Sequence, residues 1–411
     1  MRRASAGWSA AFILATGVFS TGVATPSVAQ SVVPPIINSH NVPSQPGPTN
    51  LSLKQMVAKG SQLLQEHKPL DAENVFYDAS LRYPGNFSLE ITVASLALEN
   101  GHYTRAVEAA NGAVTIDEES EPAYDLRAGA YAELKDYNRA FADIETAISL
   151  APNLPRLYKQ AGDMAINAKH YRAAIKNYNL ALGFHPEDPQ VHIALGDAYE
   201  QANLHAQAVN EYRSGIYILD QSKPAPASPD GKILQQAELS CAVSLAGLKD
   251  YTSALNIARE QLTLDPKSET TLSTVAQIED MAGEHSAAVQ LYLKALSIQP
   301  KDAIVWGNLG WAQYEEGQYA AALGSSNRAL FIDDSLKYVQ YNKGLVYAVQ
   351  GDSHDALETY RLAIANSVAA DIESGLDDVR NAIKKHGSSP VLKQALALLN
   401  SARDKALGLP D

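Results

Sequence analysis

Large apolar residues recur at helical spacing along most of this chain, and short polar breaks divide them into paired segments. The stretch from residue 155 to residue 188 shows the pattern clearly. Its first segment breaks near residues 168–170, and its second runs through Tyr178 and Leu182 and stops at Pro186. A proline pushes the preceding residue out of the helical region, so it ends the second segment. The spacing predicts an antiparallel pair of helices.

Small residues stand where the two helices of this pair would touch. Gly162, Ala174 and Ala181 lack bulk. The two backbones can therefore approach at the short end of the range of about 8 to 10 Å between packed helix axes. Tyr158 and Tyr178 are predicted to fill the remaining space between the helices.

The same unit recurs along the chain in one phase. Nine units begin at residues 53, 87, 121, 155, 189, 235, 269, 303 and 337. Position 20 is alanine in every unit: Ala72, Ala106, Ala140, Ala174, Ala208, Ala254, Ala288, Ala322 and Ala356. Position 8 is glycine or alanine in every unit: Gly60, Ala94, Ala128, Gly162, Gly196, Ala242, Ala276, Gly310 and Gly344. A fixed period of this kind indicates a stack of repeats rather than one large core.

These positions resemble those of the tetratricopeptide repeat (TPR), a helix-turn-helix unit of 34 residues. The eighth unit also keeps Trp306-x-x-Leu309-Gly310, which is similar to the opening of that family's repeat. The resemblance covers residues 53–370. It implies an all-α fold, a right-handed superhelical solenoid of about nine tetratricopeptide helix-turn-helix repeats with a C-terminal helical cap.

An insertion and a loss of phase divide the predicted array. Twelve residues more than the period allows lie near residues 223–234, which contain three prolines and a glycine. We interpret them as an inserted loop between a block of five repeats, 53–222, and a block of four, 235–370. Residues 371–411 keep helical periodicity without the repeat phase. They predict two capping helices, the first of which ends at Gly387.

The first 29 residues have the pattern of a secretory signal peptide. Arg2 and Arg3 precede an uncharged apolar stretch, and Ser27-Val28-Ala29 offers small residues for cleavage. The predicted location is therefore periplasmic or secreted, with an uncleaved N-terminal membrane anchor as the alternative. Residues 30–52 contain five prolines and predict a disordered tether.

Charge and cysteine content narrow the classes of partner. The net charge is −13, and loss of Arg2 and Arg3 with the signal peptide would leave about −15. This excess argues against nucleic acid and against an anionic membrane surface. No second stretch is apolar enough to span a membrane after cleavage. Cys241 is the only cysteine and stands at position 7 of its repeat, where a buried small hydrophobe is expected.

Motifs of enzymes are absent from the sequence, so no catalytic, cofactor-binding or metal residue is predicted. Six histidines fall in the turns between the helices of their repeats, where neighbouring turns could bridge a metal. Each repeat supplies only one, so we expect solvated turn residues instead. These histidines are His67, His102, His170, His205, His285 and His354.

The resemblance implies a concave groove lined by positions 2, 5, 6, 9, 12 and 13 of the first helices. The fourth repeat presents Arg156 and Lys159 there, without the lysine and asparagine pair that family members use to hold a terminal carboxylate. Aromatic and amide side chains coincide only in the eighth and ninth repeats, and they suit a peptide backbone and large apolar groups. The predicted partner-binding residues are Asn308, Trp311, Tyr314, Tyr338, Tyr341 and Asn342. The alternative is that these aromatic rings only pack against adjoining helices.

The sequence therefore predicts a non-catalytic scaffold outside the cytoplasm that binds peptides or partner proteins in the groove of a solenoid. Two alternatives stay open. One is an accessory subunit of an envelope machine, such as polysaccharide synthesis or export. The other is an enzyme of unrecognised type.

Overall fold

The computed structural model describes residues 51–365 and 367–408. The expected signal peptide, 1–29, and the expected tether up to residue 50 lie outside the described residues. Every regular element in the described part of the chain is a helix, and none of these helices combines the length and apolarity needed to cross a bilayer. The chain forms two compact units that divide between Ala225 and Pro226.

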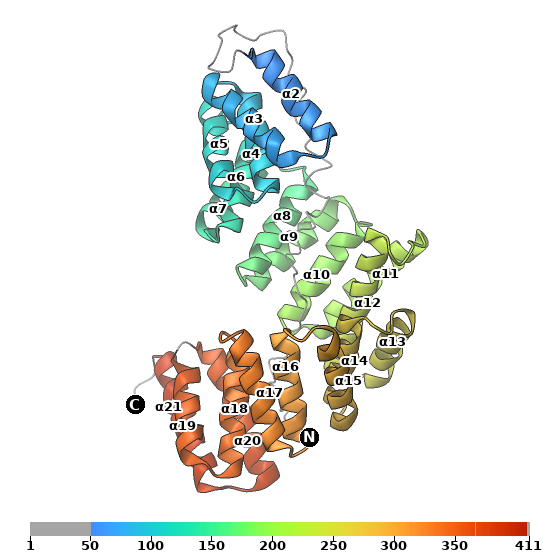
Figure 1. Cartoon of the computed structure of the whole chain (residues 1–411), viewed down its shortest axis with the longest axis vertical. Coiled ribbons are helices and arrows are strands. Elements are labelled where there is room, and N and C mark those ends of the chain that lie inside the picture. The colour runs from blue at the N-terminus through green and yellow to red at the C-terminus, as the bar shows by residue number, and fades with distance from the viewer. Residues whose placement is uncertain (1–50, 366, 409–411) are drawn as a thin grey trace. The chain divides into compact units, whose positions relative to one another are not determined.

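The unit that ends at Ala225 is a row of five antiparallel helix pairs that follow one another in chain order (Figure 1). Each helix packs against its partner, and the second helix of each of the first four pairs packs against the first helix of the next pair. The helices are α2 (Leu53–Gln65), α3 (Pro69–Arg82), α4 (Phe87–Glu99), α5 (Tyr103–Ile116), α6 (Glu121–Glu133), α7 (Tyr137–Leu150), α8 (Pro155–Asn167), α9 (Tyr171–Phe184), α10 (Pro189–Gln201) and α11 (His205–Gln221).

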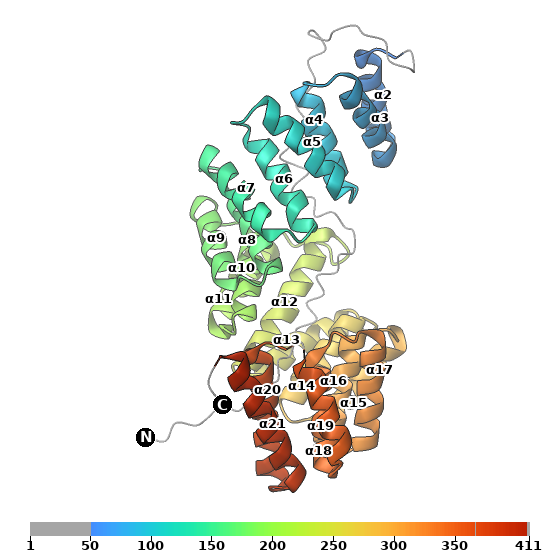
Figure 2. The same ribbon diagram turned by 90° about the vertical axis from the view of Figure 1, so that its left-hand side faces the viewer.

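The unit that begins at Pro226 contains four further pairs and two terminal helices (Figure 2). Its pairs are α12 (Pro229–Gly247) with α13 (Tyr251–Leu264), α14 (Glu269–Met281) with α15 (His285–Ile298), α16 (Ala303–Glu315) with α17 (Tyr319–Ile332), and α18 (Lys337–Gln350) with α19 (Ser353–Ile364). The terminal helices are α20 (Ala369–His386) and α21 (Pro390–Ala406).

The predicted repeat phase is confirmed by the first helices. Eight of the nine begin at the residue that the sequence pattern assigned to position 1. The ninth, α12, begins at Pro229 rather than at residue 235, so the prediction of a loop over 223–234 is wrong. Ser228 caps this helix by accepting a hydrogen bond from the Gly231 amide, and Pro229 needs no amide partner at the first helical position. The extra residues thus lengthen α11 and α12, and only residues 222–228 connect them.

A bulky ring on the second helix fills the space that a glycine leaves on the first. A Cβ atom added to Gly162 would lie 2.5 Å from the Tyr178 ring, closer than side-chain carbons approach one another. The same relation joins Gly196 to Tyr212, at 2.7 Å. In these two repeats positions 8 and 24 therefore fit each other in size and hold the two helices close together.

The turn between the helices of each repeat requires a left-handed residue. Position 15 has a φ between 56° and 87° in all nine repeats. Four repeats place glycine there, which adopts this conformation without steric cost. The other five hold His67, Lys135, Lys169, Asn203 and Lys249. This turn lets the chain reverse within three residues.

The terminal helices close the array, although they do not continue its stacking. Helix α20 packs on α18, and α21 packs on α19. A Cβ atom added to Gly375 of α20 would lie 2.6 Å from the Tyr341 ring of α18. Leu345 of α18 joins Leu376 and Val379 of α20 in one buried apolar cluster. Helix α20 thus covers a face of α18 that the groove of a repeat array would otherwise expose.

We predict that Gly162→Ala lowers the free energy of unfolding by about 1 to 3 kcal/mol, because the new methyl group overlaps the Tyr178 ring. Gly183→Ala is the matched control, since no atom lies within 4 Å of a Cβ placed there. Replacing a helical glycine by alanine at an open site is expected to stabilise by about 0.5 to 1 kcal/mol. Denaturant titrations followed by circular dichroism give both values.

A second step tests the pairing itself. In a Tyr178→Ala background, Gly162→Ala should no longer be destabilising, because repeats such as the second already hold alanine at both positions, Ala94 and Ala110. An equal cost of Gly162→Ala in both backgrounds would contradict the size relation between positions 8 and 24.

Candidate functional site

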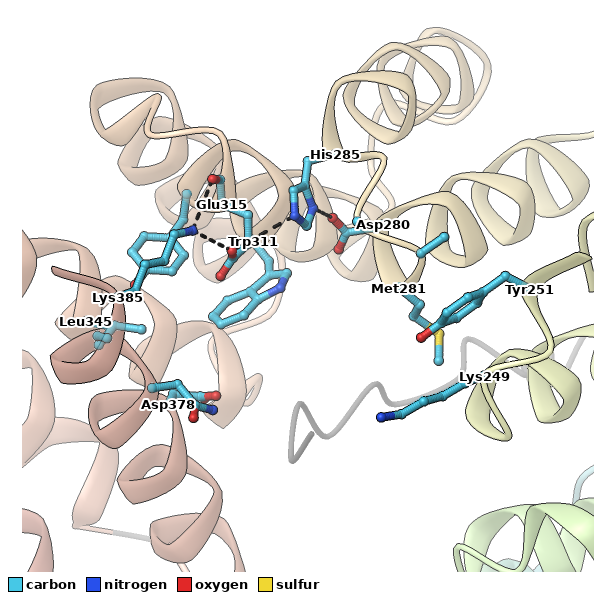
Figure 3. Close-up of a pocket in the computed structure, with 15 residues that line it drawn as sticks. Lys249, Tyr251, Asp280, Met281, His285, Trp311, Glu315, Leu345, Asp378 and Lys385 are labelled. Atoms are coloured by element: carbon cyan, nitrogen blue, oxygen red, sulfur yellow. Dashed lines mark hydrogen bonds and ion pairs between the residues drawn. The ribbon is translucent and has the colours of Figure 1, made fainter. Parts of the chain in front are cut away.

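A cavity of about 430 Å³ lies in the second unit, between the C-terminal halves of first helices and the capping helix α20. Such a volume falls within the range of pockets that hold small ligands or side chains. Figure 3 shows its lining residues. They are Lys249, Tyr251, Asp280, Met281, Ala282, Gly283, His285, Trp311, Tyr314, Glu315, Leu345, Asp378, Asn381, Ala382 and Lys385.

Aromatic rings of α16 line the middle of this cavity. The Trp311 and Tyr314 ring centroids are 5.3 Å apart and the rings are tilted by 41°. Tyr314 is 4% exposed, whereas Trp311 is only partly buried. In Figure 3 the Trp311 indole lies between the side that carries Asp378 and the side that carries Lys249 and Tyr251. The Trp311 ring is therefore accessible to a ligand, whereas the Tyr314 ring is buried and packs against Trp311.

Most charged groups of the cavity neutralise one another. The Asp280 carboxylate is 2.6 Å from His285 Nδ1, and this hydrogen bond raises the pKa of His285. Lys385 Nζ donates to Glu315 Oε2 at 2.8 Å. Figure 3 draws these contacts as one chain of charges that runs from α14 through α16 to α20. They fix the capping helix against the repeats that it covers.

Asp378 stands apart from this network. No hydrogen bond or ion pair joins its carboxyl group to another of the described residues. Burial, with the nearby Asp377 and Glu315 carboxylates, raises the pKa of Asp378 to about 8. The side of the cavity formed by α20 therefore holds an acidic group that lacks a compensating cation.

The structure separates the six residues that the sequence grouped as a binding site. Only Trp311 and Tyr314 line the cavity. Tyr341 is 4% exposed and packs under α20, as described above. The Tyr338 hydroxyl would lie 2.7 Å from a Cβ atom at Gly307, so this ring packs on the neighbouring helix α16. For these two tyrosines the packing alternative holds.

The two asparagines lie outside the cavity. Asn308 is 8% exposed and contributes to a separate, smaller hollow with residues of α12 and α14, such as Gln236 and Gln277. The residues of that hollow stand at positions 2, 3, 5, 6 and 9 of their repeats, so it belongs to the groove. Asn342 is partly buried and lines neither space.

The basic side chains that the fourth repeat presents to the groove, Arg156 and Lys159, already form ion pairs within the protein. Arg156 contacts the Glu121 carboxylate at 2.5 Å and also pairs with Asp125. Lys159 Nζ is 2.8 Å from Asp163 Oδ2. Arg156 thus joins α8 to the adjacent first helix α6, whereas Lys159 pairs within α8, so the two do not form a free basic patch.

The prediction that the turn histidines are simply solvated is wrong for three of the six. His102 lies 2.8 Å from Glu73, and His205 lies 2.9 Å from Glu200. His285 pairs with Asp280, as described above. For His205 and His285 the reason is spacing, because an acid at position 12 lies next to a histidine at position 17 once the turn reverses the chain. His102 instead reaches Glu73 on the second helix of the preceding repeat. A buried carboxylate at these places has a polar partner, as its desolvation requires.

One trio among the described residues places its ligand atoms within 4.8 Å of one another, as metal ligands lie. It consists of His354, Asp355 and Glu358 at the start of α19. The His354 and Glu358 side chains are 85% and 61% exposed. Exposed groups one helical turn apart are the ordinary outcome of i and i+4 spacing.

Family models confirm that the repeats are tetratricopeptide repeats. Models described as "Tetratricopeptide repeat" match residues 121–154, 156–225 and 291–324. TPR repeat-containing protein MJ1428 of Methanocaldococcus jannaschii is 40% identical over 70 residues, which are 17% of this chain and 12% of that protein. Photosystem I assembly protein Ycf3 of Acaryochloris marina is 36% identical over 67 residues, which are 16% of this chain and 40% of that protein. The matches thus span less than half of either relative.

A solved structure of similar fold covers more of the chain. The apo form of RapI matches 78% of this chain and 98% of its own, with a TM-score of 0.56 and 15% sequence identity. At this level of identity the likeness concerns the fold alone. It agrees with an all-helical solenoid of repeats.

We predict that Asp378→Asn stabilises the protein increasingly as the pH rises from 5 to 8. The folded carboxyl group, with a pKa of about 8, keeps a proton that the same group loses near its ordinary pKa of 3.8 in the unfolded chain. Wild-type stability therefore falls with rising pH across this window, and asparagine removes that loss. We expect the free energy of unfolding of Asp378→Asn to exceed that of wild type by at least about 1 kcal/mol at pH 8.

Thermal and denaturant unfolding at pH 5, 6, 7 and 8 measure this difference. A stability difference between the two proteins that stays constant over the whole range would show that Asp378 titrates as an exposed carboxyl group does.

Proposed function

We propose that this chain, which is a tetratricopeptide repeat protein, is a non-catalytic scaffold that binds a segment of a partner protein outside the cytoplasm. Repeats of this family typically bind proteins. The finer part of the proposal concerns the place of binding, which we assign to the cavity between α16 and α20.

The observation that carries this proposal is the half-open aromatic cavity beneath the capping helix. Interaction sites in proteins combine a buried aromatic anchor with polar groups at its rim. Here Trp311 and Leu345 form the apolar part, and Asp378, Asn381 and Lys249 surround it. The smaller hollow around Asn308 lies on the same row of first helices and offers a polar extension for the same peptide.

The location outside the cytoplasm rests on the residues at the start of the sequence. Arg2, Arg3 and the apolar stretch that follows have the order of a secretory signal, and Ala29 ends the small-residue site. A single buried cysteine suits that location, because it leaves no thiol free to cross-link copies of the protein. Cys241 is 1% exposed.

We predict that Trp311→Ala weakens peptide binding by about thirtyfold, because a buried aromatic anchor is worth about 2 kcal/mol. The test selects displayed random dodecapeptides on the mature chain and measures the dissociation constants of the selected peptides. Trp306→Ala is the matched control. Its indole donates to the Pro300 carbonyl at 3.0 Å and lines neither hollow, so its loss should leave binding within a few-fold of wild type.

Circular dichroism of both variants shows whether they remain folded. Selected peptides that bind folded Trp311→Ala as tightly as wild type would place the binding surface elsewhere on the repeats.

We also predict that the mature protein begins at Gln30 and is recovered from the periplasm or the medium. N-terminal sequencing of protein from fractionated cells decides between cleavage after Ala29 and retention. An intact Met1 in washed membranes would show that the protein keeps its N-terminal segment as a membrane anchor and is not secreted.

A further inference from the structure

The cavity beneath α20 joins an aromatic ring and a carboxyl group without a cation between them. Trp311 comes from α16, Asp378 comes from α20, and both line the same space. On the basis of the function proposed above, we propose that this cavity receives a basic side chain of the partner, arginine in preference to lysine, between the Trp311 indole and the Asp378 carboxylate.

The charge beside Trp311 and α20 favours a cation as the ligand, while Lys249 lines the opposite side of the cavity. Three carboxyl groups line it, and two of them are already paired, Asp280 with His285 and Glu315 with Lys385. Asp378 is left without a partner among the described residues. A buried carboxylate that lacks a counter-charge is costly, and a guanidinium group that enters the cavity would supply both the charge and hydrogen bonds.

Burial, together with the Asp377 and Glu315 carboxylates, raises the pKa of Asp378 to about 8, because its surroundings disfavour the negative charge. A bound cation would restore that charge. An anionic side chain would instead meet the carboxylates of Asp378 and Glu315 at close range, and it would leave the Asp378 desolvation uncompensated.

The same chain already uses this geometry inside its own repeats. The Arg127 guanidinium lies over the Tyr124 ring, 5.1 Å from its centroid, and donates two hydrogen bonds to Asp143, each 2.7 Å long. An arginine can thus stack its plane on a ring while the edge of its guanidinium donates to a carboxylate. The cavity provides a ring and a carboxylate in the same way, but the described residues place no arginine there.

The shape of the cavity suits a long side chain with a planar end. A volume of about 430 Å³ holds an arginine side chain and part of the adjoining backbone. Leu345 and Ala382 provide apolar surface for its methylene groups. A planar guanidinium stacks on an indole while it pairs with a carboxylate, whereas an ammonium group cannot do both as well. Lys249, on the opposite side, would disfavour a second positive charge next to the first.

The test measures retention of three octapeptide pools by the immobilised mature chain at pH 8.5. The pools are random except for a central arginine, a central citrulline, which is the neutral isostere, or a central glutamate. We expect the arginine pool to be retained about tenfold more strongly than the citrulline pool and the glutamate pool least of all. In Asp378→Asn the ratio of arginine to citrulline retention should fall close to one.

Asp334→Asn is the matched control, since it removes one exposed carboxylate of the same unit that does not line the cavity. It should keep the wild-type ratio, which separates a local effect from loss of net negative charge. Circular dichroism at the same pH checks that each variant is folded.

Equal retention of the arginine and citrulline pools by wild type, or an arginine preference that survives in Asp378→Asn, would overturn the inference. If retention then still depends on Trp311, the proposed binding cavity stands and only its preference for a basic side chain fails. If no pool shows retention that depends on Trp311, the cavity is not the binding site and both proposals fail.

Discussion

The close contact between the two helices of each repeat is the constraint on which the rest of this structure depends. A repeat of 34 residues has no core of its own beyond the seam between its helices, so the side chains at that seam set their separation. Where position 8 is glycine, position 24 can be a ring, as in Gly162 with Tyr178. Where position 8 is alanine, position 24 is alanine in two repeats, as in Ala94 with Ala110, but it is the buried Tyr292 in the repeat of Ala276. The size relation between the two positions therefore holds in some repeats and not in all.

The capping helices decide which part of the groove stays open. Helix α20 lies on α18 through Gly375 and Leu376, so Tyr341 becomes a core residue although it stands at a groove position. The same helix stops short of covering Trp311. The cavity is therefore a consequence of how the cap meets the array, because a further repeat in regular register would have continued the groove without enclosing it.

Much of the fold could be predicted because its determinants are local and repeat in phase. Alanine at position 20 and small residues at position 8 located eight first helices to the residue. The start of α12 was missed because prolines usually indicate a loop, yet Pro229 stands at the first position of a helix, where proline is well tolerated. The left-handed turn at position 15 could have been found from its four glycines, since they share one position with lysine, asparagine and histidine.

The candidate site was harder to predict because it depends on contacts between elements far apart in the sequence. Asp378 lies on a helix outside the repeat phase, and nothing in its local sequence distinguishes it from the adjacent Asp377. Their difference is one of surroundings: Asp377 pairs with Arg380 at 2.8 Å, whereas Asp378 turns toward the cavity.

The ion pairs between repeats bear on how a strongly acidic chain would select one basic ligand, as proposed above, rather than attract every cation. Acids such as Asp143 and Glu73 form ion pairs with arginines of their own or a neighbouring repeat. Asp143 pairs with Arg127, and Glu73 pairs with Arg105. General attraction for cations comes from the whole surface and is screened by salt, so it gives little discrimination. Selectivity requires a carboxyl group that is shielded from water, lacks an internal partner and lies beside a ring. In the described part of this chain the cavity under α20 combines these properties, because the helix that closes it brings its acid from outside the repeat pattern.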